Sequence, residues 1–163
     1  MRILRVVADS SCLIGLAQIG LFGLLKDLFL EVHIPPAVYQ EVVVNGRDET
    51  GANETESALK EDWILLTAAK DEIAVKALTT ALGKGESEVI VLSKELGADF
   101  ALIDEKSARN TADLLNVDTV GILGIIDLAN EMGFSLDKKR LVDCLRQSGF
   151  RISEKIYKKL FPE

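Results

Sequence analysis

Four carboxylates in this sequence stand beside apolar residues rather than in polar stretches. Asp9 and Asp104 directly follow short apolar runs, "ILRVVA" and "FALI". Glu41 lies in "PPAVYQEVV", and Glu86 lies in "GKGESEVIVL". Helical spacing puts each glutamate on the same face as apolar neighbours. These four positions are therefore the candidates for chemistry.

Each of these acids also has an ordinary structural explanation. The two aspartates could cap the helices that follow them; Glu41 could pair with an arginine, and Glu86 could lie over a helix N-terminus. Four carboxylates directed toward one edge of a sheet, however, raise one another's pKa unless a cation neutralises them. The chain has no cluster of lysines or histidines for this, and its one histidine, His33, is expected to be structural. We therefore expect a divalent cation, and all-oxygen ligands favour Mg²⁺ or Mn²⁺ over zinc.

A carboxylate-only site of this kind, with no histidine base, indicates phosphodiester hydrolysis. The ion lowers the pKa of a bound water and stabilises charge on a phosphoryl oxygen, which supplies much of the catalysis in such reactions. The segment "GKGES" does not form a phosphate loop, because no serine or threonine follows Lys84 and residue 78 is not glycine. The sequence also contains no G-x-G-x-x-G after its first apolar run and no G-x-S-x-G.

Three further residues are candidates for supporting roles. Ser10 and Ser11 follow Asp9 directly, and either they cap the next helix or they hold Asp9 or a water on the metal. Arg109 has two interpretations as well. It could be a helical partner of Glu105 four residues before it, or it could face the acids and hold a carboxylate or a phosphate.

Alternating strand and helix patterns predict the elements that position these residues. Short continuous apolar runs alternate with helical patterns, which is typical of an α/β fold with a mostly parallel sheet covered by helices on both faces. Strands are predicted over residues 3–9, 30–34, 63–68, 99–104 and 118–122. Helices are predicted over residues 10–20, 22–29, 36–44, 53–61, 71–82, 85–96, 105–115, 122–133, 137–147 and 153–160. Ligands of such sheets bind beyond the carboxyl ends of the strands, where Asp9 and Asp104 fall.

Length and composition indicate an ordinary globular protein. The chain has 163 residues, of which 48% are hydrophobic and 28% charged, and this length fits one domain. Cys12 and Cys144 form no metal or disulfide pattern, so we expect free thiols in a reducing, cytoplasmic compartment. We predict no signal peptide, because Asp9 interrupts the first apolar run. No apolar run is long enough for a membrane span.

The charge of the chain is distributed unevenly. The net charge is −7, which argues against a positively charged coat for nucleic acid. Residues 1–136 carry net −11 and are expected to form an α/β domain, whereas residues 137–163 carry net +4 and are expected to form a basic helical extension packed on it. This extension is either a solvated helical pair or a surface that steers phosphate or docks a partner.

The motifs resemble those of the PIN-domain ribonucleases, most closely the small prokaryotic branch that includes toxins of toxin–antitoxin pairs. The segments "VVADSSCLI", "IPPAVYQEVV" and "GKGESEVIVLSKELGADFALIDEKSAR" carry the resemblance, which covers roughly residues 3–130. In that family a carboxylate opens a helix, a glycine follows 11 residues later and an aspartate follows 18 residues later. Glu86, Gly97 and Asp104 match this spacing, with Glu86 in place of the commoner aspartate.

The resemblance implies a PIN-like fold and a Mg²⁺- or Mn²⁺-dependent endoribonuclease that cleaves single-stranded RNA with a metal-activated water. Asp9, Glu41, Glu86 and Asp104 would then be the catalytic, metal-binding acids. A homodimer and a small antitoxin partner are also implied.

Two alternatives stay open. A catalytically inert PIN-like module would bind RNA or protein instead of cleaving RNA. A different magnesium-dependent phosphatase or a receiver-like domain is disfavoured. A receiver needs adjacent acids after its first strand and a lysine ending a late strand, and the sequence shows neither.

Overall fold

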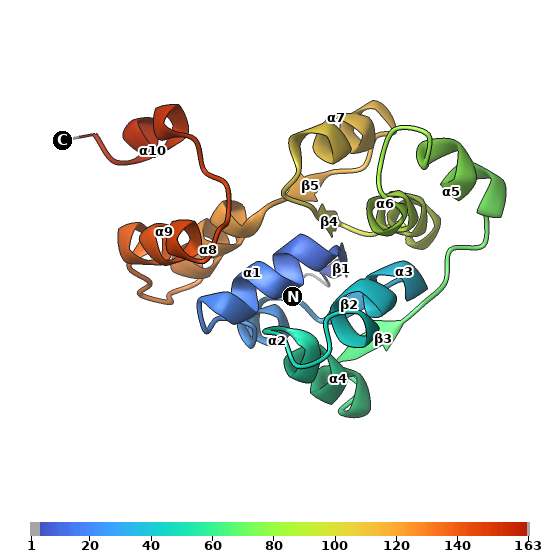
Figure 1. Ribbon diagram of the computed structural model, residues 1–163, viewed down its shortest axis with the longest axis horizontal. Helices are drawn as coiled ribbons and strands as arrows, with labels where there is room; N and C mark the ends of the chain where they lie inside the picture. The colour runs from blue at the N-terminus through green and yellow to red at the C-terminus, as the bar shows by residue number, and fades with distance from the viewer. Residues whose placement is uncertain (1–3, 163) are drawn as a thin grey trace.

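A central parallel sheet organises the protein, whose computed structural model describes residues 4–162 (Figure 1). Its strands lie in the order β3-β2-β1-β4-β5, and every neighbouring pair is parallel. The strands are β1 (Arg5–Ala8), β2 (Glu31–Ile34), β3 (Ile64–Leu66), β4 (Phe100–Leu102) and β5 (Thr119–Val120). The chain leaves β1 toward β2 and β3 and later returns to the other side of β1 with β4. The order of strands therefore switches between β1 and β4.

Helices cover both faces of this sheet. α6 packs on β1 and β4 and contacts α5 and α7, whereas α1 packs against α4 and α8 on the opposite face (Figure 1). The helices are α1 (Ser10–Gln18), α2 (Leu24–Leu28), α3 (Pro36–Tyr39), α4 (Ala52–Lys60), α5 (Glu72–Leu78), α6 (Lys84–Leu96), α7 (Lys106–Leu114), α8 (Ile122–Glu131), α9 (Lys138–Gln147) and α10 (Glu154–Leu160). The predicted three-layer α/β architecture is confirmed. Within residues 4–162, none of the helices is both long and apolar enough to span a membrane.

The segment over residues 36–44 differs from its prediction. One continuous helix was expected, but α3 passes into a π-helical turn, η1 (Gln40–Val44). The amide of Asn45 donates to the carbonyl of Gln40 at 2.8 Å, which is the i to i+5 bond of a π-helix. The wider turn changes which side chains face the core after Val38, and this matters for Glu41. Helix α5 is also shorter than the predicted 71–82.

One continuous core lies between the layers. The three inner residues of β1 (Val6, Val7 and Ala8) are fully buried, as expected for the central strand of a covered parallel sheet. Leu141 and Leu145 of α9 belong to the same buried cluster. The first of the two C-terminal helices is therefore anchored in the core of the α/β fold.

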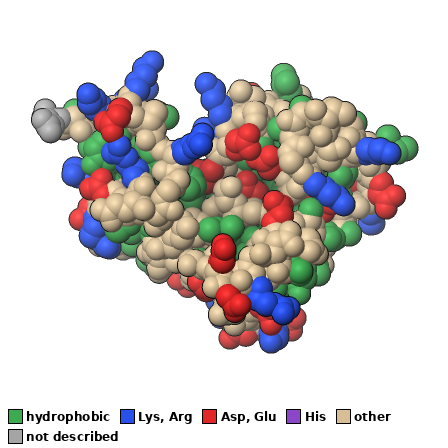
Figure 2. Space-filling view, in the orientation of Figure 1, with side chains coloured by type: hydrophobic (Ala, Val, Ile, Leu, Met, Phe, Trp, Pro, Cys, Tyr) green, Lys and Arg blue, Asp and Glu red, His purple; other side chains and the backbone are tan. Residues whose placement is uncertain are grey.

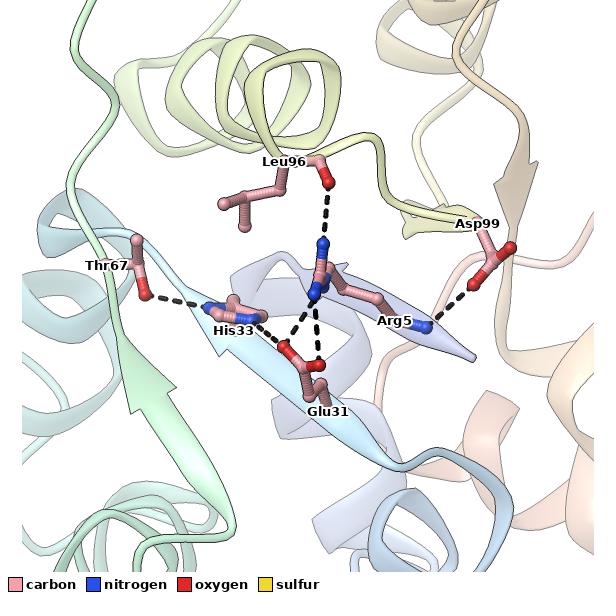
Figure 3. Close-up of polar contacts among 6 residues, drawn as sticks. All are labelled: Arg5, Glu31, His33, Thr67, Leu96 and Asp99. Carbon is pink, nitrogen blue, oxygen red and sulfur yellow. Dashed lines mark hydrogen bonds and ion pairs between the residues drawn. The ribbon is translucent and has the colours of Figure 1, made fainter. Parts of the chain in front are cut away.

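A polar network joins β1 and β2 to the residue that follows β3, on the face that α6 covers (Figure 3). The Nε and Nη2 atoms of Arg5 donate to the two carboxylate oxygens of Glu31 at 3.0 and 3.1 Å. His33 contacts the same carboxylate through Nε2 at 3.0 Å and the hydroxyl of Thr67 through Nδ1 at 2.8 Å. The expectation that His33 is structural is therefore confirmed.

Arg5 also links β1 to the last residue of α6 and to the residue before β4 (Figure 3). Its Nη1 donates to the carbonyl oxygen of Leu96 at 2.9 Å, and its backbone amide donates to Asp99 Oδ2 at 2.8 Å. Favourable contacts with Arg5 come first among the causes that lower the pKa of Glu31. The Arg5–Glu31 pair is thus a two-point ion pair, which is stronger than a typical surface pair.

We expect the Glu31→Gln substitution to lower the free energy of unfolding by about 1–2 kcal/mol, because it removes the negative charge and replaces one of the two acceptor oxygens with an NH2 donor. Urea unfolding at pH 7 measures this. Glu56→Gln is the control, because its i,i+4 pair with Lys60 is solvent-exposed and contributes about 0.3–0.5 kcal/mol. Because the folded pKa of Glu31 is lowered, the difference between wild type and Glu31→Gln should shrink as the pH falls through that pKa. Equal losses in both variants would contradict the special role of Glu31.

Candidate active site

Asp9 and Asp104 lie together at the carboxyl edge of the sheet, where the strand order switches. Ala8 pairs with Leu102 in the register of β1 and β4, and the amide of Asp9 donates to the carbonyl oxygen of Leu102 at 3.1 Å. The two aspartates follow these paired strand ends. The sequence prediction that both belong to one edge is therefore confirmed by the strand pairing.

Asp9 caps helix α1 and is only 2% exposed. Its Oδ1 atom accepts a hydrogen bond from the amide of Cys12 at 2.9 Å. Burial, helped by the negative charges of Asp104 and Glu41 and opposed by the bond from Cys12, raises the pKa of Asp9 from its ordinary 3.8 to about 7. The capping role expected of Asp9 is thus present, but it does not offset the cost of burying the charge.

Asp104 is held by two donors from distant parts of the chain. The amide of Ile122, at the start of α8, lies 3.1 and 3.2 Å from its two carboxylate oxygens. The thiol of Cys12 donates to Oδ2 at 3.1 Å. Burial raises the pKa of Asp104, while the bonds from Cys12 and Ile122 and the charge of Arg109 act in the opposite direction. The charge of Arg109 thus lowers the pKa of Asp104, but the side chain of Arg109 is exposed, so both interpretations of this residue stay open.

Glu86 has the helix-start role that its sequence position suggested, and its pocket position is compatible with the ligand role. Its Oε1 accepts from the amide of Gly83 at 3.3 Å, so it is a helix-start residue of α6. Its side chain also lines the same pocket as Asp9. Burial first, and then a hydrogen bond and the negative charge of Glu105, raise the pKa of Glu86 to about 7. The pKa of Glu105 is lowered in turn, so of the two side chains Glu86 is the one that keeps its proton to higher pH.

Glu41 differs from expectation in its burial. It was expected to share the face of its core neighbours, but the residue is exposed, whereas Val38 and Val42 are buried. The π-helical turn accounts for this, because it changes the angular spacing of side chains after residue 39. The carboxylate of Glu41 instead lies against Gly85, where a Cβ atom would be 2.0 Å from its Oε1.

The acids surround a small pocket of about 210 Å³. Three of the four predicted acids line it, together with both predicted serines: Asp9, Glu41, Glu86, Ser10 and Ser11. Asp104 lines the adjoining pocket, so it lies beside the other acids.

Sequence reasoning missed four residues that shape this site. Cys12 contacts both aspartates, and Glu105 lines the pocket and raises the pKa of Glu86. Gly85 and Gly121 provide space for carboxylates, since a Cβ atom on Gly121 would lie 2.4 Å from Asp104 Oδ1. Only Glu105 had a signal in the sequence, because it directly follows Asp104 at the end of a strand.

The donor set of the pocket fits a small divalent cation. Every acid contributes oxygen, which Mg²⁺ and Mn²⁺ prefer. The pKa values of Asp9 and Glu86 are raised to about 7, so these carboxylates lack full neutralisation. The hydroxyl oxygen of Ser10 is buried without a hydrogen-bond partner, which gives the pocket another unused ligand atom. Among the described residues, no three acid, histidine or cysteine side chains are already gathered closely enough to hold a metal ion, so binding requires side-chain adjustment.

Comparisons with known proteins identify relatives of the fold. The model of a family described as a PIN domain matches residues 5–163. Among solved structures, the chain is similar to a PilT N-terminus domain protein from the hyperthermophilic archaeon Sulfolobus solfataricus, with a TM-score of 0.58 and 19% sequence identity. That likeness covers 81% of this chain and 98% of the archaeal chain, and at this identity it concerns the fold alone. A search of curated proteins found no match.

Without metal, the thermal stability should fall as the pH rises. The folded pKa of Asp9 is about 7 and its ordinary value is 3.8, so the unfolded chain releases this proton at lower pH than the folded chain does. The contribution of this proton to stability is therefore full below pH 3.8 and is lost as the pH rises through 7. We expect Asp9→Asn to melt at least about 5–10 °C higher than the wild type at pH 8 in EDTA. The gap should close toward pH 4.

Differential scanning calorimetry at several pH values checks this. Asp113→Asn is the control, because Asp113 is exposed on α7. A pH-independent gap between wild type and Asp9→Asn would show that the charge of Asp9 is not the cause.

Crowding Asp104 through Gly121 should weaken metal binding without unfolding the protein. The Cβ atom of Gly121→Ala would displace the Asp104 carboxylate, and we expect a loss of about 10–100-fold in Mn²⁺ affinity measured by calorimetry. Gly23→Ala is the matched control, because nothing lies within 4 Å of its Cβ position. Unchanged affinity in Gly121→Ala would mean that Asp104 is not a ligand in its observed position.

Proposed function

The chain belongs to the PIN-domain family, as its motifs predicted, and from this membership and the acidic pocket we propose that it is a divalent-metal-dependent endoribonuclease acting on single-stranded RNA. PIN domains are generally nucleases and generally use divalent metal ions. The observation that carries the proposal is the gathering of Asp9, Glu41, Glu86 and Asp104 around the switch point, with raised pKa values at three of them. Clustered, perturbed carboxylates in a cleft mark functional sites.

Asp9, Glu41, Glu86 and Asp104 are the residues that would hold the ion. When bound there, a Mg²⁺ or Mn²⁺ ion supplies positive charge that stabilises phosphoryl oxygens and makes water more acidic. Ser10 and Ser11 would support the site from the pocket wall, because both line it.

The protein's own hydrogen bonds orient the acids before substrate arrives. The amide of Cys12 fixes Asp9, and the amide of Ile122 fixes Asp104. Because these donors belong to the first turns of α1 and α8, the carboxylates are held by rigid helices rather than by mobile loops. Such preorganisation lowers the cost of reaching the transition state.

Two further groups handle protons and phosphate in the proposed reaction. Glu105 lines the pocket beside the acids that would hold the ion, and its carboxylate would be placed to accept a proton from the attacking water. Arg109 places positive charge near Asp104. A scissile phosphate bound at the acids would gain from that charge.

The finer biological role proposed is that of a toxin held inactive by a small antitoxin, acting as a homodimer in the cytoplasm. The motif resemblance supports this role, and the free thiols of Cys12 and Cys144 suit a reducing compartment. Growth arrest on expression of the wild type, and normal growth on expression of the inactive variant described next, would support the toxin role. Light scattering on the purified protein would decide between monomer and dimer.

We expect Asp104→Asn to lower cleavage of a labelled single-stranded RNA by at least about 100-fold and to weaken Mn²⁺ binding. The substitution removes one charge from the site and keeps the shape of the side chain. Calorimetric Mn²⁺ titration followed by RNA incubation of the same samples measures both effects. Asp113→Asn, an exposed aspartate on α7, should behave as the wild type.

The outcomes separate the nuclease from its main alternative. Binding and cleavage that are both lost in Asp104→Asn support the nuclease. Mn²⁺ binding without cleavage of any RNA would favour an inert RNA-binding or protein-interaction module. Absence of Mn²⁺ binding in the wild type would leave Glu86 as a helix-start residue only.

A further inference from the structure

The acidic pocket is the middle of a longer groove. On one side it shares Ser11 and Glu105 with a pocket of about 410 Å³. On the other side it shares Glu41 and Gly85 with a pocket of about 450 Å³. A groove that continues past the acids in both directions suits a chain molecule whose reacting bond lies within the chain rather than at its end.

The 410 Å³ pocket lies between α1 and the loop that joins α9 to α10. Residues 148–151 of this loop form one wall, and α1 supplies Ser11, Ile14, Gly15 and Gln18. Asp104 and Glu105 line its inner end. The basic C-terminal extension thereby reaches the predicted reaction site, although the two are far apart in sequence.

We propose that this pocket is a seat for a nucleotide of the RNA strand next to the scissile phosphate, with Arg151 binding its phosphate and Phe150 contacting its base. The inference rests on the proposed function, because the acids define where the scissile phosphate lies. Arg151 is exposed, and no ion pair among the described residues uses it. Its guanidinium is therefore available for a phosphate.

The chemistry of the remaining lining residues matches a nucleotide. Gln18 and Ser148 are exposed polar side chains that can hydrogen-bond a sugar or base edge. Phe150 is half-buried and packs against α1, with its Cε2 atom 3.6 Å from the Cβ position of Gly15. An aromatic ring held in this way offers a fixed surface on which a base can stack.

The uneven distribution of charge along the chain favours RNA binding at the C-terminal extension. Residues 1–136 carry net −11, and such a surface repels RNA, whereas residues 137–163 carry net +4. Figure 2 shows Lys and Arg side chains flanking the hollow between the C-terminal helices and α7, with Asp and Glu side chains beside them. The extension thus supplies attraction next to acids that would otherwise repel the strand.

Contacts within the extension fix the loop in place. The hydroxyl of Tyr157 donates to Asp143 Oδ1 at 2.6 Å, and Arg146 pairs with Glu154 and lies 4.4 Å from the centre of the Tyr157 ring. These contacts hold α10 on α9, and Leu145 anchors α9 in the core. Arg146 of α9 is engaged in these contacts, whereas Arg151 in the loop remains available for a ligand.

The test measures binding of a short labelled single-stranded RNA by fluorescence anisotropy, in an Asp9→Asn background so that no cleavage occurs. We expect Arg151→Ala to weaken binding about tenfold and to lower the salt dependence of binding by about one phosphate contact. Arg140→Ala is the control, since it is an exposed arginine at the opposite end of α9, and it should change affinity less than about twofold. Equal effects of the two substitutions, or none from Arg151→Ala, would overturn the proposal.

A second variant tests the base contact. Phe150→Leu keeps an apolar side chain on Gly15, so the fold should persist, and circular dichroism checks this. It should weaken binding of RNA and not of inorganic polyphosphate. Equal loss for both ligands, or loss for neither, would overturn the nucleotide seat in favour of a simple anion site.

Failure of this proposal can be told apart from failure of the nuclease. Metal-dependent cleavage by the wild type together with RNA binding insensitive to Arg151→Ala would remove the seat and keep the nuclease. RNA binding sensitive to Arg151→Ala without any cleavage would keep the seat and remove the nuclease.

Discussion

The burial of like charges at one edge of the sheet is the constraint on which the rest of this site depends. Pairing β1 with β4 forces Asp9 and Asp104 to the same edge, and burial raises the pKa of both. These two side chains accept hydrogen bonds from Cys12 and from the first turn of α8. These bonds still leave their charge incompletely neutralised. An arrangement that is costly in isolation makes physical sense when a cation completes it.

The polar network around Arg5 shows the opposite solution in the same sheet. There, Glu31 receives donors from both Arg5 and His33, and its pKa is lowered rather than raised. Satisfied networks of this kind stabilise and specify a fold. The contrast indicates that the unsatisfied acids near Asp9 are a feature of that edge and not a general property of this acidic chain.

The C-terminal extension resolves a conflict between net charge and the proposed substrate. A protein of net charge −7 attracts RNA poorly as a whole. Because α9 is anchored in the core, the loop carrying Arg151 adjoins the acidic pocket and local positive charge is placed where it has an effect. Attraction near the site matters more than the total charge, since salt screens interactions beyond about 8 Å.

The sequence by itself determined the order of the elements and placed Asp9 and Asp104 at the carboxyl ends of strands. Apolar runs, helix-capping residues and the glycines that end helices are local signals. The sequence also indicated the charged extension. Only the tertiary structure decided the details of the site. The bond between Cys12 and Asp104 joins residues 92 positions apart, and the Glu86–Glu105 contact depends on how α6 packs against α7. The exposure of Glu41 depends on a π-helical turn for which the sequence carried no periodic signal. Raised pKa values follow from burial, and burial is a property of the packed layers rather than of any segment alone.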